Sequence, residues 1–182
     1  TAIIWEGDPE TLEFMYVSPE CEKILGYSPT EWTSDPGFWQ RHIHPEDRGW
    51  AVDYCSRAVR NLSKHTFDYR MIAADGRIVW LRDIVNVVVE DGRPRKLVGV
   101  MIDISELKEI QGDLEYVSGL QRLMVDVSRD LFEAAESTLD TVFSETLEKI
   151  GRWCRADRAY LIRFTPDLAH YSTELRGFYF DF

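Results

Sequence analysis

The stretch from His42 to Asp47 has the residue types and spacing of a metal site. His42 and His44 alternate, so on a strand they would share a face, and the carboxylates of Glu46 and Asp47 follow directly. The same residues also fit the start of a helix. Pro45 suits a first helical turn, and Glu46 and Asp47 would then lie where the helix dipole favours acids. We favour the helix start and predict no metal here.

Catalytic chemistry has little support in the sequence. There is no glycine-rich phosphate loop, no nucleophile elbow and no histidine in a phosphoacceptor helix pattern. Cys21, Cys55 and Cys154 are far apart and form no C-x-x-C pair, which is typical of reduced thiols inside a cell. We therefore expect no enzymatic activity within these residues and a cytoplasmic location.

Charge and hydrophobic patterning exclude two further classes of partner. The 182 residues carry 32 acidic against 21 basic side chains, a net charge of −11, which would repel phosphate and argues against nucleic-acid binding. The longest apolar runs, such as Val87 to Val89, fall far short of the roughly 20 residues that span a bilayer. We expect no membrane segment in this chain.

Hairpin signals predict the central strands. Asp75-Gly76 separates two runs rich in β-branched and aromatic residues, and a two-residue turn there would oppose Met71 with Trp80 and Tyr69 with Arg82. Opposed residues share a face of the sheet. One face would therefore carry Phe67, Tyr69, Met71, Ile78, Trp80 and Ile84, and the reverse would carry Asp68, Arg70 and Asp83.

The remaining pattern completes an α+β domain. Short apolar runs at 3–5 and 14–17 read as strands, the broken helical pattern from 18 to 61 as short helices, and a second hairpin at Asp91-Gly92 leads into a last strand. This gives a five-stranded antiparallel sheet with short helices on one face, followed by a long connecting helix.

Four segments in order carry a family resemblance. They read FMYVSPECEKILGYSPTEW, IHPEDR, FDYRMIAADGRIVWLRD and LVGVMIDISELK, from residue 14 to residue 108. Together they resemble a PAS domain with its PAC motif, in the subclass whose middle carries HPED. The resemblance implies the same fold and a sensory role.

Neither of the cofactors common in this family is supported. Flavin-binding PAS domains share an asparagine-cysteine-arginine-phenylalanine motif that does not occur here, and Cys55 lacks that context. Haem-binding members use a histidine on the helix over the sheet, whereas His65 precedes a strand and His42 and His44 fit the helix start. The cofactor is therefore unknown.

Aromatic bulk could line a ligand pocket between helices and sheet, or simply fill that space. A small-molecule ligand and a filled core both stay open. The candidate pocket residues are Phe14, Ile24, Leu25, Tyr27, Phe38, Trp39, Phe67, Tyr69, Met71 and Trp80.

The junction after the last strand is the best candidate for signal relay. Asp103, Ile104 and Ser105 resemble the family's closing aspartate, isoleucine and threonine, with serine keeping the hydroxyl. Physically, Ser105 could cap the outgoing helix while Asp103 ties the junction back to the domain. A plain helix start without signalling is the alternative.

The linker after the junction predicts a parallel dimer. Apolar residues near three-four spacing, with acids on the other faces, favour a two-chain coiled coil over a helix packed on its own domain. The stripe consists of Leu107, Ile110, Leu114, Val117, Met124, Val127 and Leu131. Gly112 and Gly119 would each weaken this helix by about 1 kcal/mol.

The last region reads as a helix followed by an apolar strand and resembles the opening of a GAF domain. We therefore expect a PAS/PAC sensor at 1–104, a signalling helix at 105–131 and a partial GAF-like segment at 132–182. The resemblance implies a sensory module of a two-component or related signal-transduction protein, most often a histidine kinase, and the apolar stripe of the linker predicts that this module is a homodimer. A diguanylate cyclase and a ligand-free PAS interaction module are the alternatives.

Overall fold

The computed structural model describes residues 2–135, 138–156, 158–163 and 174–179. Contacts divide the chain into two compact units, Thr1–Ile110 and Gln111–Phe182. The first unit contains β1 (Ala2–Gly7), β2 (Phe14–Val17), α1 (Glu20–Leu25), α2 (Pro29–Ser34), α3 (Phe38–His42), α4 (Pro45–Arg60), β3 (His65–Ile72), β4 (Ile78–Glu90) and β5 (Arg93–Asp103). The helix α5 (Ser105–Glu133) begins in this unit and continues into the second.

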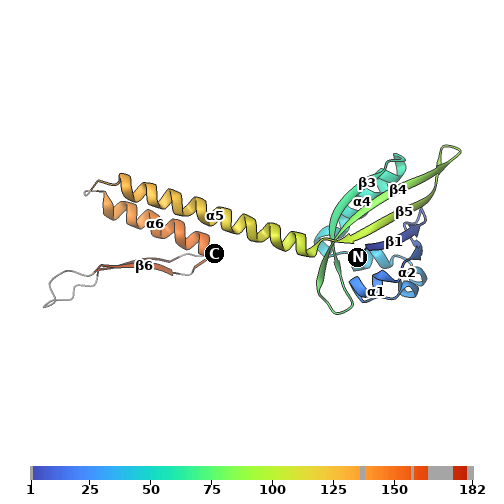
Figure 1. The fold of residues 1–182 in the computed structure, drawn as a ribbon, viewed down its shortest axis with the longest axis horizontal. Helices are drawn as coiled ribbons and strands as arrows, with labels where there is room; N and C mark the ends of the chain where they lie inside the picture. The colour runs from blue at the N-terminus through green and yellow to red at the C-terminus, as the bar shows by residue number, and fades with distance from the viewer. Residues whose placement is uncertain (1, 136–137, 157, 164–173, 180–182) are drawn as a thin grey trace. The chain divides into compact units, whose positions relative to one another are not determined.

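The five strands of the first unit form one antiparallel sheet in the order β2-β1-β5-β4-β3, and α1 to α4 pack against one face of it (Figure 1). Burial alternates along β3 and β4, as expected for strands with one face toward a core. The predicted α+β architecture and the long helix after the sheet are confirmed.

The register of the β3–β4 hairpin differs from the prediction by one residue. Ile72 pairs with Ile78 and Arg70 with Trp80. The Ala73 amide donates to the Arg77 carbonyl at 2.9 Å, so the loop between these two residues has three residues, 74–76, and not two. The amide of Gly76 donates to the Ala73 carbonyl at 2.9 Å, and Gly76 has a φ of +87°, which glycine adopts without strain.

This one-residue shift exchanges the two faces of β4, since neighbouring side chains point to opposite sides. Trp80, Ile78 and Ile84 therefore lie on the face away from the helices, and Asp83 lies in the core. The predicted placement of Trp80 with Tyr69 and Met71 is wrong, while Phe67, Tyr69 and Met71 themselves are buried as expected.

The second hairpin is confirmed at the predicted dipeptide. Glu90 pairs with Arg93 across Asp91 and Gly92, which have φ values of 51° and 73°. Two consecutive residues with positive φ are what a two-residue turn of this handedness requires.

The second unit contains the rest of α5, α6 (Leu139–Cys154), β6 (Arg158–Arg163) and β7 (Glu174–Tyr179). The predicted helix followed by a strand is present, and β7 pairs with β6 in antiparallel orientation.

The indole of Trp153 on α6 lies against α5, where a Cβ on Gly119 would come within 2.1 Å of the ring. Gly119 therefore permits close packing of the two helices, whereas nothing lies within 4 Å of the corresponding point on Gly112. None of the helices described has the length and apolar content needed to cross a bilayer.

Candidate functional site

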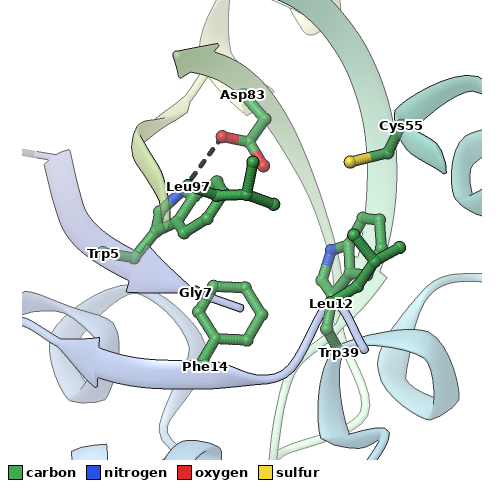
Figure 2. Close-up of a pocket in the computed structure, with 8 residues that line it drawn as sticks. All are labelled: Trp5, Gly7, Leu12, Phe14, Trp39, Cys55, Asp83 and Leu97. Atoms are coloured by element: carbon green, nitrogen blue, oxygen red, sulfur yellow. Dashed lines mark hydrogen bonds between the residues drawn. The ribbon is translucent and has the colours of Figure 1, made fainter. Parts of the chain in front are cut away.

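The predicted pocket residues fill the core more than they line a cavity. All except Trp80 lie between helices and sheet, with Tyr27 partly buried. They leave a cavity of about 10 Å³ lined by Trp5, Gly7, Leu12, Phe14, Trp39, Cys55, Asp83 and Leu97 (Figure 2). Phe14 and Trp39 are the predicted residues in this lining. A space of that size holds about one water molecule.

Asp83 is the acidic group of this cavity and was missed by sequence reasoning. Its carboxylate accepts a hydrogen bond from the indole Nε1 of Trp5 at 3.0 Å, drawn as the dashed line in Figure 2. The hydroxyl of Tyr69 donates to the other oxygen at 3.4 Å, and Trp39 donates to that hydroxyl at 2.9 Å. A polar chain therefore crosses the core from α3 through β3 and β4 to β1.

The buried thiols are unreactive structural groups. Burial raises the pKa of Cys55 to about 12 and that of Cys21 to about 11, so both stay protonated at neutral pH. Cys21 Sγ also donates to the carbonyl oxygen of Tyr27 at 3.2 Å.

The HPED segment starts α4 and fastens it to β3. Pro45 occupies the first turn, and His44 Nδ1 accepts from the backbone amide of Glu46 at 3.4 Å. Asp47 is buried and receives two bonds from the Arg70 guanidinium, at 2.7 and 2.8 Å, and one from the Arg70 amide at 2.9 Å. These bonds lower the pKa of Asp47 to about 2. The predicted helix start is confirmed.

His42 and His44 lie on different elements, at the end of α3 and at the N-cap of α4, and do not form a shared metal site. His42 is the last residue of α3, and its Nδ1 lies 2.7 Å from the Phe38 carbonyl oxygen. Across the part of the chain that the structure describes, no three histidine, cysteine or acidic side chains gather into a possible metal site.

Two cations lie over the ring of Trp80, on the face of the sheet away from the helices. The guanidinium carbon of Arg70 lies 5.4 Å from the centre of its ring, and Nζ of Lys108 on α5 lies 5.0 Å from it. Lys108 also pairs with Asp68 at 3.1 Å, and Asp68 forms a bidentate pair with Arg82. Side chains of β3 and β4 thus contact the first turn of α5.

The predicted relay residues lie at this same point. The amide of Ile104 donates to the Trp80 carbonyl at 2.9 Å, and the amide of Trp80 donates to the Ser105 hydroxyl at 3.0 Å. Asp103 Oδ1 accepts from the Ser105 amide at 2.9 Å. The roles expected of the two polar residues are therefore exchanged: Asp103 caps the helix and Ser105 ties it to the sheet.

The apolar stripe of α5 is exposed in its first part. Leu107, Ile110, Leu114, Val117 and Met124 are between 42% and 64% exposed. Val127 and Leu131 are half-buried, in the region where Asp130 on α5 pairs with Lys149 on α6.

Comparisons with known proteins agree with this geometry. Residues 14–101 match the PAS fold family. The N-terminal domain of a diguanylate cyclase with PAS/PAC sensor from Marinobacter aquaeolei is 37% identical, with a TM-score of 0.56 over 59% of this chain and 99% of that one.

A second solved structure supports the fold alone. The sensory box histidine kinase/response regulator from Burkholderia thailandensis E264 is 24% identical, with a TM-score of 0.56 over 66% of this chain and 90% of that one. The comparison with curated proteins gave no match. Because the Marinobacter domain is covered almost completely at 37% identity, the chain belongs to the PAS fold family.

Proposed function

We propose that this chain is the sensory module of a longer bacterial signalling protein. Residues 1–104 form a PAS/PAC sensor of the HPED-containing subclass, 105–131 a signalling helix, and 132–182 the beginning of a GAF-like segment. The output domain lies elsewhere in that protein. The relative at 37% identity comes from a diguanylate cyclase, which favours a cyclase output, with a histidine kinase as the alternative.

The observation that carries this proposal is the double backbone attachment of α5 to β4. Trp80 uses both its amide and its carbonyl to hold Ser105 and Ile104, and its ring contacts Lys108 one turn later. A shift of β4 must therefore either move the first turn of α5 or break these bonds. This is how a change in the sensor would reach the helix.

The input to the sensor is proposed to act on the core. A ligand larger than water would have to displace side chains such as Leu12 or Phe14, because the cavity measures only about 10 Å³. The filled core also supports a rival function in which the PAS unit acts through protein contacts without a ligand.

The relay is tested with Asp103→Ala and Ser105→Ala in the full-length protein. Each loses a bond at the junction, which costs typically about 1 kcal/mol, and a coupling of the same size alters a two-state output severalfold. We expect changed basal or stimulated output, measured as cyclic diguanylate synthesis or autophosphorylation, with a small change in melting temperature.

Ser105→Thr is the matched control because it keeps the hydroxyl that accepts from Trp80. We expect it to retain the wild-type output. If Asp103→Ala and Ser105→Ala also retain wild-type basal and stimulated output, the junction is only a helix start.

We also propose that α5 dimerises in parallel through the stripe from Leu107 to Leu131. Its first five residues expose apolar side chains at heptad spacing, and a second copy would remove them from water. The half-buried Val127 and Leu131 would extend the contact only at its edge.

Light scattering on the 182-residue chain tests the dimer. Leu114→Asp places a charge in the stripe and is expected to give a monomer at tens of micromolar, where the wild type is a dimer. Gly112→Asp adds the same charge two residues earlier, on the opposite side of the helix and in open space, and should stay dimeric. A monomeric wild type would contradict the proposal.

A further inference from the structure

Asp83 is a carboxyl group enclosed by neutral side chains. It is 1% exposed, and it projects from β4 to the edge of the cavity shown in Figure 2. A carboxylate can accept about four hydrogen bonds. Asp83 receives one from Trp5 at 3.0 Å and one from Tyr69 at 3.4 Å, which is longer than the usual O–H···O distance of about 2.5–3.0 Å. The site therefore supplies fewer hydrogen-bond donors than an ionised carboxylate can accept.

The elements packed around Asp83 offer no positive charge to balance it. The titratable groups that face it are Tyr69 on β3 and Cys55 on α4. Burial raises the pKa of both, so both are neutral near pH 7. The other elements contribute side chains that do not titrate: Trp5 from β1, Trp39 from α3, and Leu97 and Met101 from β5.

We propose that Asp83 is a proton-sensing residue of the PAS unit: the neutral acid keeps the core closed around its cavity, and the ionised carboxylate opens the core to water. Ionisation places a charge where the surrounding side chains cannot solvate it, and water admitted through the cavity supplies the missing donors. Any effect on output rests on the function proposed above, because Trp80, which holds the junction, lies on the same strand.

The pH range follows from the energetics of burial. Burial raises the pKa of Asp83 from 3.8 to about 7, against the lowering effect of the bonds from Trp5 and Tyr69. A raised pKa in the folded state means that the group stabilises the fold fully below pH 3.8. This stabilisation is lost as the pH rises toward 7. The closed core is thus weakened progressively between pH 3.8 and about 7.

Urea unfolding of the whole chain between pH 4 and 9 tests the assignment. Relative to Asp83→Asn, the wild type's unfolding equilibrium constant should rise by up to about tenfold per pH unit between pH 4 and 7, and then level off. Asp68→Asn is the matched control. The pKa of Asp68 is lowered by its bonds from Arg82, so this variant should run parallel to the wild type above pH 5. Parallel curves for Asp83→Asn would overturn the proposal.

Two measurements on the wild type do not depend on how Asp83→Asn folds. One aspartate carboxyl carbon should titrate near pH 7 in NMR spectra. Above that pH the indole N–H of Trp5 should exchange with solvent faster relative to that of the buried Trp32. If every aspartate titrates below pH 5, or if the exchange ratio stays constant, the assignment is wrong. These readouts use no output domain, so they succeed or fail separately from the proposed signalling function.

Discussion

Replacing Gly99 with alanine is expected to destabilise the first unit by about 3 kcal/mol, at the upper end of the usual cost of overpacking. Gly99 lies on β5 opposite Trp5 on β1, and the indole packs directly over it. An added Cβ would lie 2.3 to 2.6 Å from three atoms of that ring. The ring cannot move aside without losing its bond to Asp83 and its edge contact with Phe14.

Urea unfolding followed by tryptophan fluorescence measures this loss. The double variant Gly99→Ala with Trp5→Phe is the control, because the smaller ring makes room for the methyl group. The two changes together should cost at least about 1 kcal/mol less than their sum. A free energy of unfolding for Gly99→Ala within about 0.5 kcal/mol of wild type, or strict additivity, would show that the two residues are not tightly packed.

The second large effect is expected at the HPED segment. Asp47→Ala should lower the free energy of unfolding by about 3 kcal/mol, since it removes a buried acceptor from Arg70 and leaves a partly buried cation with poorer partners. Glu46→Ala is the control: its side chain is 72% exposed and pairs with the same guanidinium, so its removal should cost less than about 1 kcal/mol.

The pH dependence separates charge from packing at this position. Bonds from Arg70 lower the pKa of Asp47 from 3.8 to about 2. A lowered pKa means that Asp47 stabilises the fold above pH 3.8 and that this contribution disappears as the pH falls toward 2. The difference between wild type and Asp47→Ala should therefore shrink between pH 5 and pH 2. A difference that stays constant would assign the effect to packing alone.

Local signals in the sequence predicted the elements well. The start of α4 follows from Pro45 with Glu46 and Asp47 after it, and the second hairpin from the dipeptide Asp91-Gly92. Such features depend on neighbouring residues, so they can be read without knowing what packs against them. The predicted sheet has the observed strands for the same reason.

The face of β4 could not be fixed by the turn dipeptide alone. Asp75-Gly76 fits both a two-residue and a three-residue loop, and the choice reverses every side chain on the strand. The pairing of opposite charges across the two strands would have indicated the correct register. The observed register places Asp68 against Arg82, where they form a salt bridge, whereas the predicted register placed Tyr69 there.

The exchange of roles between Asp103 and Ser105 depends on the edge of the sheet. Strand pairing between β4 and β5 ends at Leu81 and Asp103, which leaves the backbone groups of Trp80 without partners on β5. Buried or half-buried backbone groups need partners, and Ile104 and Ser105 supply them. The need for these two partners can be recognised only when the strand register is known. The size of the cavity likewise depends on side-chain packing that composition does not reveal.

Under the proposed function, the alternation along β4 separates the side chains that would meet the input from those that would pass it to α5. Side chains at 79, 81, 83 and 85 point into the core, and those at 80 and 82 contact the charged surface beside α5. On this proposal, mutations in the core set would change the input specificity while the surface set at 80 and 82 keeps its composition. A strand of this kind lets a lineage acquire new stimuli without redesigning its connection to the effector, and it offers protein engineers the same separation for building sensors.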